Sequence, residues 1–178
     1  MPAADTAAGS REQIVDSPAR QAGFVVAGED LTITHARYAA AEHVAGPHIH
    51  RHHTDAFYVL EGELIFQIGP AAETIAISAG GFVAAPPGLA HAFRVADSGP
   101  ASWLTIHAPD GGFAAFMRGL RDGIEIEWDI APVPADGGLP ADHAVFSRLP
   151  DPVGASGSWT PAQSGGSDLP RRGGGRLG

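Results

Sequence analysis

A succession of short β-prone runs, separated by turns, occupies residues 23 to about 109. The runs are rich in β-branched and aromatic residues, whereas glycine, proline and acidic residues stand between them. Large apolar residues occupy every second position from 64 to 68, which is typical of a strand with one more deeply buried face. Many short strands at close spacing predict an all-β sandwich or barrel. The eight runs are GFVVAGE, LTITHARYAA, DAFYVLEG, ELIFQIG, ETIAIS, GFVAAP, HAFRVA and SWLTIHAP.

One segment after these runs has helical periodicity instead. Four large apolar residues fall at positions i, i+3, i+4 and i+7, Asp110 stands where it can cap the helix start, and Gly123 stands where a C-terminal cap belongs. We predict one short C-terminal helix whose apolar stripe packs on the outside of the barrel or in a dimer interface. In the alternative, its aromatic rings close the mouth of the barrel over a substrate. The stripe consists of Phe113, Phe116, Met117 and Leu120.

The composition divides the 178 residues into three parts. Residues 1–20 are polar and mixed, which predicts a flexible N-terminal arm. Residues 21–147 hold the predicted barrel, its helix and an extension that we expect to wrap back onto it. Residues 148–178 are dominated by glycine, proline and serine, with too few apolar groups to offset the entropy of ordering. We predict a disordered tail there, without a catalytic role.

Charge and missing residue types narrow the possible functions. The chain has no cysteine, which excludes disulfides and thiolate metal sites, and no lysine, which excludes Schiff-base chemistry through that amine. Its net charge of −9 at pH 7 argues against nucleic acid or an anionic membrane as a partner, because both are also anionic. The first residues lack the basic and apolar regions of a signal peptide, and no apolar run has the roughly 20 residues of a membrane span. We therefore expect a cytoplasmic protein.

Histidines are concentrated in one segment, since six of the nine lie between residues 35 and 53. His48 and His50 are two positions apart, so on an extended strand both imidazoles point to the same side. Asp55 opens the next predicted strand, and His91 follows a proline-rich turn later in the chain. Neutral imidazoles with one carboxylate form a donor set that suits one divalent transition metal, which would be Fe, Ni, Mn, Co, Cu or Zn.

Two segments around these residues resemble the two sequence motifs of the cupin superfamily. Residues 46–62 resemble the first motif, which has a glycine, then His-x-His, an acid a few residues on, and a closing glycine. Residues 80–91 resemble the second motif, which runs glycine, Pro-x-Gly and a closing histidine. The resemblance covers roughly residues 23–116 and implies a double-stranded β-helix, or jelly-roll barrel. It further implies that one metal ion is bound by His48, His50, Asp55 and His91.

Two positions depart from the family's pattern. The family's acid is usually glutamate, whereas this chain has Asp55, which is one methylene shorter. Its carboxylate would reach the metal only if the strand start moves inward, or would bind through a water. A three-histidine site, with Asp55 as an acid beside the ligands, is therefore the alternative. Val95 stands where the second motif usually ends in asparagine, which removes a polar group near the ligands but no ligand.

The remaining histidines receive structural interpretations by default. His52 and His53 lie in the loop between ligands, where side chains usually face solvent, although one of them can substitute for Asp55 at the metal. His35 and His107 lie on predicted strands as core or rim residues, and an inward-facing His107 would contribute to a substrate pocket. Those expected at the surface are His43 and His143.

The residues around both motifs, together with the segment APDGGFAAFMRGL that follows them, resemble those of single-domain bacterial cupins grouped with quercetinase-like dioxygenases. That resemblance implies a non-haem dioxygenase acting on a hydroxylated aromatic small molecule, flavonol-like or polyketide-like, with Asp55 as the catalytic base. The alternative is a zinc-type polyketide cyclase or isomerase that does not use oxygen. A third possibility is a non-catalytic small-molecule-binding cupin. Because small cupins commonly pair, we also expect a homodimer.

Overall fold

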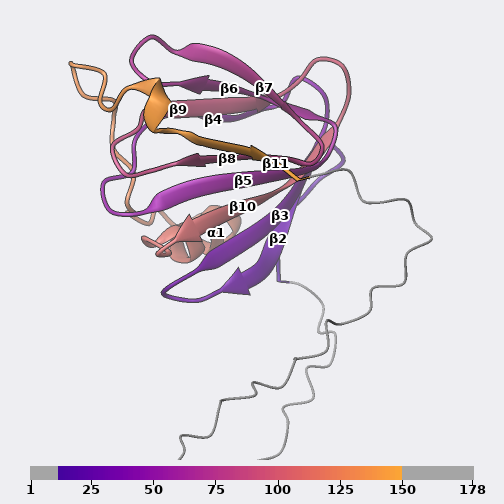
Figure 1. Ribbon diagram of the computed structural model, residues 1–178. Coiled ribbons are helices and arrows are strands. Elements are labelled where there is room, and N and C mark those ends of the chain that lie inside the picture. The colour runs from indigo at the N-terminus through magenta and orange to yellow at the C-terminus, as the bar shows by residue number, and fades with distance from the viewer. Residues whose placement is uncertain (1–11, 150–178) are drawn as a thin grey trace, which may run out of the picture.

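The computed structural model describes residues 12–149, which form two antiparallel β-sheets, one α-helix and one short 3-10 helix (Figure 1). The elements are β1 (Gln13–Asp16), β2 (Arg20–Ala27), β3 (Thr32–Tyr38), β4 (His43–His48), β5 (Thr54–Glu61), β6 (Glu63–Ile68), β7 (Glu73–Ser78), β8 (Gly81–Ala85), β9 (His91–Val95), β10 (Ala101–Ala108), α1 (Phe113–Asp122), η1 (Ala141–His143) and β11 (Val145–Arg148). The larger sheet has the strand order β1-β2-β3-β10-β5-β8-β11, and the smaller sheet has the order β4-β9-β6-β7. The predicted all-β jelly roll with one short helix is confirmed.

The eight predicted runs correspond to β2, β3 and β5 to β10. Three further strands in the described residues, β1, β4 and β11, have no counterpart among those runs. β1 lies within residues 1–20, where the sequence predicts a flexible arm, but it pairs with β2 and is held as an outer strand. β4 contains a glycine and a proline, which sequence reasoning places outside strands, and its pairing with β9 is interrupted by two register shifts.

The predicted helix is confirmed as α1, and both of its ends have the expected stabilising groups. Gly123 caps its C-terminus in the left-handed conformation, with φ at 70°. Gly112 occupies the N-terminal cap position, while the Asp110 carboxylate accepts hydrogen bonds from the N–H groups of Gly112 and Ala114, at 3.0 and 2.9 Å. Asp110 therefore stabilises the helix start from two residues before the cap position.

The apolar stripe of α1 is only partly buried. Phe113 is buried and Phe116 is half-buried, but Leu120 remains 57% exposed. The ring of Phe113 stacks on His107 with 3.7 Å between ring centroids, and the ring of Phe116 stacks on Trp128 at 4.9 Å. Phe113 thus contacts a buried histidine directly, whereas Phe116 contacts Trp128, which in turn contacts His107. This arrangement corresponds to the alternative in which the stripe helps to close the barrel mouth.

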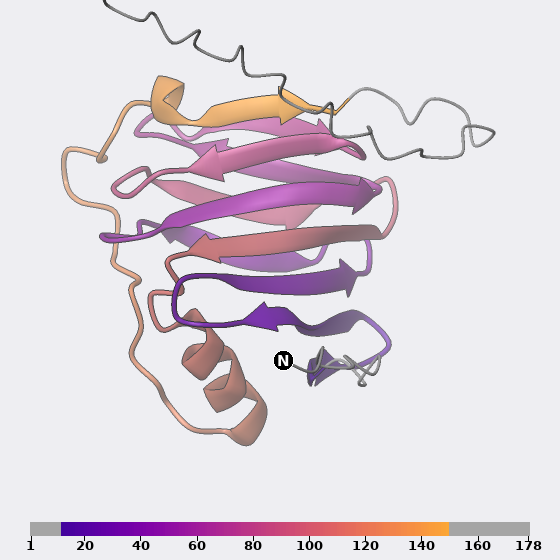
Figure 2. The same cartoon turned by 60° about the horizontal axis from the view of Figure 1, so that its bottom comes forward.

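The segment between α1 and β11 runs along one end of both sheets (Figure 2). Isolated β-bridges tie Ala131 to Ile49 and Gly138 to Leu89, and β11 then pairs with β8. Within the described part of the chain, no helix has the length and apolar character that crossing a membrane requires. Apart from its first two residues, the predicted tail lies outside the described residues.

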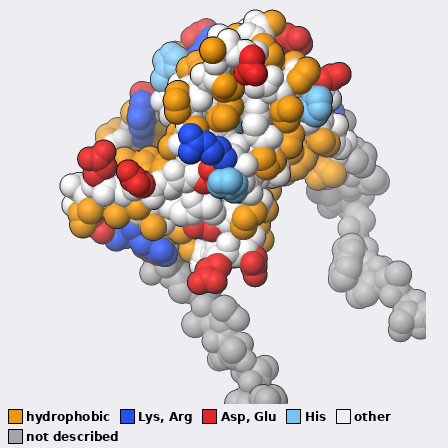
Figure 3. All heavy atoms as spheres, turned by 90° about the vertical axis from the view of Figure 1, so that its left-hand side faces the viewer, with side chains coloured by type: hydrophobic (Ala, Val, Ile, Leu, Met, Phe, Trp, Pro, Cys, Tyr) orange, Lys and Arg blue, Asp and Glu red, His pale blue; other side chains and the backbone are white. Residues whose placement is uncertain are grey.

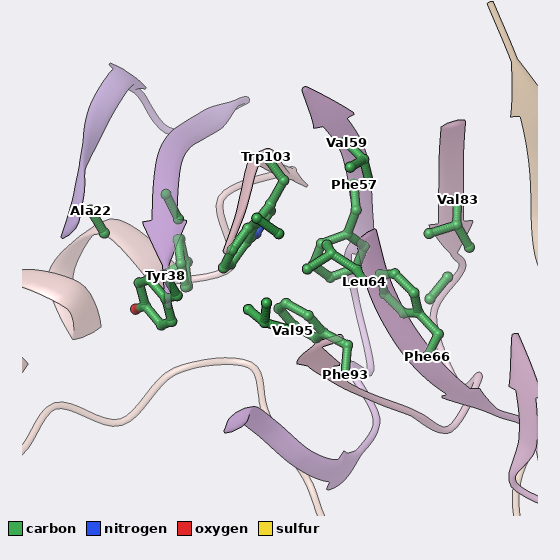
Figure 4. Packing of buried hydrophobic residues seen from close by; sticks show 14 of the residues in the cluster. Ala22, Tyr38, Phe57, Val59, Leu64, Phe66, Val83, Phe93, Val95 and Trp103 are labelled. Carbon is green, nitrogen blue, oxygen red and sulfur yellow. The ribbon is translucent and has the colours of Figure 1, made fainter. Parts of the chain in front are cut away.

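The apolar core lies between the two sheets (Figure 4). Leu64, Phe66 and Ile68 are buried, as their alternation in the sequence predicts. Three phenylalanine rings from β5, β6 and β9 contact one another with centroid distances of 4.6–5.3 Å. The largest buried side chains of this core are Trp103, Phe57, Phe66, Leu64, Ile68 and Leu89.

Candidate metal centre

The four residues predicted as ligands meet at one end of the barrel interior. His48 ends β4 and His50 follows it, whereas Asp55 and His91 stand at the starts of β5 and β9. β4 and β9 place His48 directly opposite His91 in their register. All four side chains are buried, and one ligand atom of each lies within 4.8 Å of the others. The fold therefore brings these residues to one point, and their binding of a metal stays a prediction.

Asp55 reaches the histidines although its side chain is short. Its Oδ2 atom lies 3.5 Å from His50 Nε2 and 3.4 Å from His91 Nε2. His48 Nε2 lies 3.2 Å from His50 Nε2 on the same side of the cluster. One carboxylate oxygen and three imidazole nitrogens thus form a single N₃O donor set, without a displacement of the start of β5.

Backbone carbonyl groups fix the tautomers of the three clustered histidines. The Nδ1 atoms of His48, His50 and His91 each lie 2.5–3.0 Å from a carbonyl oxygen. Because a carbonyl oxygen only accepts hydrogen bonds, each Nδ1 carries the proton and each Nε2 keeps a lone pair. Three lone pairs then face one another, an arrangement that a bound cation stabilises, so the residues fit a metal ion. The carbonyl groups belong, in that order, to Gly46, Asp129 and Leu89.

Burial and neighbouring charges favour the metal-binding protonation states of His48 and Asp55. Burial, followed by the charge of His91, lowers the pKa of His48 to about 4. Burial alone would raise the pKa of the Asp55 carboxyl group, but the neighbouring histidines, above all His107, hold that pKa below its usual value. Neutral imidazoles and an ionised carboxylate are the forms in which these residues bind a divalent metal.

His53 is the position where the sequence-based expectation was wrong. Its side chain is fully buried rather than facing solvent. Its Nδ1 donates a hydrogen bond of 2.8 Å to the Asp129 carboxylate, and its Nε2 lies 2.9 Å from His107 Nδ1. Gly111 passes so close that a Cβ atom there would lie 2.5 Å from His53 Nδ1. The segment after β10 therefore encloses a loop that the sequence alone places at the surface.

The other histidines take the places expected for them. His52 is exposed, and so are His43 and His143. His35 is half-buried on β3, with its Nε2 atom 2.8 Å from the Ser102 hydroxyl group. None of these four side chains belongs to the buried histidine cluster.

Trp128 and Asp129 are functional candidates that sequence reasoning missed. The Trp128 ring lies 5.0 Å from the His50 ring, 5.9 Å from His53 and 5.7 Å from His107, measured between centroids. Asp129 supplies a carbonyl oxygen to one ring and a carboxylate to another. Both residues stand in residues 124–130, where apolar and acidic residues alternate as in a strand, although the structure forms no strand there. This alternation does not indicate that Trp128 and Asp129 contact the histidines.

The end of the barrel interior that contains the cluster has a mixed outer surface. Figure 3 shows the face on the left of Figure 1, where acidic, basic and histidine side chains stand among apolar ones. On this face, basic side chains occur singly or in small groups. The charged groups are therefore not gathered into a stripe of one sign there.

A family comparison and a structural comparison agree with this architecture. Residues 34–107 match the family model described as "Cupin domain". No curated protein matches the chain. The bacterial pirin YhhW from Escherichia coli, solved in complex with nickel(II), has a TM-score of 0.52 and 15% sequence identity over 79% of this chain and 55% of that chain. At that identity the similarity shows a shared fold alone.

Two other solved structures are similar to the barrel at lower TM-scores. KdgF from Halomonas sp. has a TM-score of 0.48 and 21% identity, over 55% of this chain and 86% of that chain. An RmlC-like cupin from Shewanella frigidimarina has a TM-score of 0.49 and 17% identity, over 58% of this chain and 88% of that chain. Residues 34–107 thus match the cupin family model, and the two-sheet fold is consistent with that match.

Proposed function

We propose that this chain is a metal-dependent dioxygenase that acts on hydroxylated aromatic small molecules. The observation that carries the proposal is the buried N₃O set of His48, His50, His91 and Asp55. This set suits the redox-active divalent metals Fe, Mn, Co, Ni and Cu as well as Zn. When bound, such a metal would polarise a substrate oxygen and, if redox-active, assist electron transfer to dioxygen.

Asp55 has the properties of the base in this reaction. Its Oδ2 atom faces His50 and His91, while its Oδ1 atom is buried without a hydrogen-bond partner. An ionised carboxylate with one free oxygen can accept the proton of a substrate hydroxyl group. Dioxygen is the oxidant: both of its atoms enter the product, one carbon–carbon bond of the ring breaks, and the proton held by Asp55 returns to the product.

The aromatic residues around the cluster favour a flat substrate. Phe113, Phe116 and Trp128 contact one another, with ring centroids 4.9–6.4 Å apart, and Phe113 and Trp128 also contact the His107 ring. Apolar and aromatic walls with a few polar groups are typical of pockets for small aromatic ligands. They also exclude water, which protects reactive intermediates from side reactions.

Metal analysis and oxygen uptake test the reaction class. Protein purified without added metal should contain a redox-active metal and should consume oxygen with some members of a panel of phenolics and β-diketones. Zinc with turnover but without oxygen uptake would replace this proposal with a cyclase or isomerase. Tight binding without any turnover would indicate a binding protein.

Asp55→Asn tests the role of the base. The three histidines should retain a substantial part of the metal, while turnover per bound metal should fall about 10²-fold or more, because an amide cannot take the proton. Asp97→Asn is the matched control, since Asp97 is an exposed carboxylate that pairs with Arg94 and not with a residue of the cluster. Turnover in Asp55→Asn equal to that of the wild type would place the base on another residue.

A further inference from the structure

Two buried polar atoms beside the metal cluster lack hydrogen-bond partners. Among the described residues, Asp55 Oδ1 and His107 Nε2 are the buried side-chain atoms without one. They lie 3.7 Å apart, which is too long for a direct hydrogen bond between them. Their juxtaposition follows from the β5–β10 register, in which Asp55 stands opposite His107. Buried polar groups of this kind usually meet a partner, so the pair indicates a position for a ligand.

A chain of hydrogen bonds determines which protons these atoms carry. The Asp129 carboxylate accepts the N–H of His53 Nδ1, so His53 Nε2 keeps its lone pair. That lone pair accepts the N–H of His107 Nδ1, at 2.9 Å. His107 Nε2 therefore also keeps its lone pair and turns it toward the carboxylate of Asp55. Two acceptor atoms face each other, with no proton between them.

Asp129 is held firmly at the start of this chain. One of its carboxylate oxygens accepts the backbone N–H of Arg51 at 3.0 Å, and the other accepts the backbone N–H of His52 at 2.7 Å. The backbone N–H of Asp129 itself donates to the carbonyl of Gly111. The carboxylate thus cannot rotate away from His53 without losing two backbone hydrogen bonds.

A second metal ion does not explain the pair. His50, His53 and His107 lie close enough to hold an ion by distance alone. His50 directs its Nε2 into the first cluster, and both nitrogens of His53 are already hydrogen-bonded. Only one nitrogen of this group is free, so the group lacks the ligands for another ion.

Two facing acceptors select the chemistry of their ligand. A group that brings two protons satisfies both acceptors, whereas a carboxylate brings none and is repelled by the ionised Asp55. We propose that His107 is a specificity-determining residue, which with Asp55 accepts hydrogen bonds from the two hydroxyl groups of a catechol-type aromatic ligand. The inference rests on the proposed function and narrows its substrate class to vicinal dihydroxy aromatics.

The ligand must pass the aromatic cover to reach this position. Asp55 and His107 are both buried, and Trp128 is the half-buried ring that contacts His107. Phe113 stacks on the His107 ring, is itself buried, and contacts Trp128 with 5.2 Å between ring centroids. Trp128 is the more exposed of the two rings, so the proposal requires that Trp128 be displaced for a ligand to reach the acceptor pair.

Binding of two matched probes tests the proposal. Catechol and benzoate both carry one benzene ring, and their binding to the zinc-loaded protein is measured by calorimetry without oxygen. We expect the wild type to prefer catechol, and His107→Phe to bind catechol about 10-fold more weakly or worse, with benzoate binding and zinc content unchanged. His43→Phe, an exposed position on β4, is the control and should keep the preference. An undiminished preference in His107→Phe overturns the proposal.

Nitrogen-15 NMR of the histidine rings tests the same inference without a ligand. In the zinc-loaded wild type, His53 and His107 should each carry a proton on Nδ1 and none on Nε2. In Asp129→Asn the amide group can donate to His53, so a part of the His107 population should become protonated on Nε2. A proton on His107 Nε2 in the wild type would overturn the proposal. Neither readout uses oxygen, so both remain informative if the protein is not a dioxygenase.

Discussion

The two ends of the barrel interior are built on the same strands but have opposite chemistry. Along β5 the inward positions run from Asp55 through Phe57 to Val59, and β9 repeats this order from His91 through an aromatic ring to a valine. Side chains of a strand point inward at every second residue. Two residues along either strand therefore lead from the metal cluster into the apolar core that Figure 4 shows.

The difference between the two ends lies in what completes them. At the apolar end, side chains from the two sheets pack against one another, and their fit is a matter of shape and volume. At the histidine end, buried rings need hydrogen-bond partners, and several come from outside the strands: Asp129 supplies two, and Trp128 covers them. The core is formed by the strands with Phe113, Ala114 and Met117 of α1, whereas the candidate site requires the segment after α1 as well.

The largest expected effect is at the histidine end, where His91→Ala should weaken metal binding. Removing one of three converging imidazoles should weaken metal binding by more than the roughly 10–100-fold that loss of a supporting group costs. A zinc competition titration measures the loss, and His43→Ala on the same sheet is the control. Wild-type affinity in His91→Ala would show that the ion is bound elsewhere.

Acid should destabilise the metal-free protein through the histidine end. Burial lowers the pKa of His48 and of His107 from 6.5 to about 4 in the folded state. Below pH 6.5 the unfolded chain therefore binds protons that the folded chain does not, so the free energy of unfolding falls as the pH drops toward 4. Each ring contributes on the order of 3 kcal/mol to this loss. Urea unfolding between pH 7.5 and 4 measures this loss of stability. A free energy of unfolding that rises on acidification would contradict the lowered pKa values of the two histidines.

The apolar end should respond to Phe93→Ala in stability rather than in metal binding. The Phe93 ring is buried against Phe57, Phe66 and Trp103, with centroid distances of 4.6–5.9 Å. Its removal should lower the free energy of unfolding by about 3–5 kcal/mol. Phe93→Leu fills part of the space and should cost less. Under conditions where the variant is folded, zinc affinity should stay near the wild-type value, and its complete loss would show that the two ends are not independent.

The fold was predictable because its signals are local. Alternating apolar residues and the turns between them identify eight strands from neighbouring positions alone. The shared orientation of His48 and His50 was predictable for the same reason, because a spacing of two residues places both rings on one side of an extended chain. β4 itself was not among the predicted runs, because its glycine and proline hide a strand whose pairing is irregular.

The rest of the site depends on contacts that no local pattern records. Asp129 bonds to His53 across 76 residues of sequence, and to His50 across 79. The burial of His53 follows from these bonds and from the close passage of Gly111, not from the polar loop in which His53 stands. His107 was expected on a strand, as a core or rim residue. That it faces Asp55 depends on the β5–β10 register, which sequence alone does not give.

The smallest effect is expected at Thr105, which stands on β10 between the two ends. Trp103 Nε1–H donates a hydrogen bond of 3.0 Å to Thr105 Oγ1, and both residues are buried. Thr105→Val keeps the shape but leaves a buried donor without a partner, so the free energy of unfolding should fall by about 1–3 kcal/mol. The double variant with Trp103→Phe removes donor and acceptor together, and its loss should be smaller than the sum of the two single losses by about 1 kcal/mol. Urea unfolding of the four proteins measures this coupling. Additive losses would show that the hydrogen bond between Trp103 and Thr105 does not contribute and that packing alone couples these residues. A parallel change in zinc affinity would show that the hydrogen bond also orients the histidines.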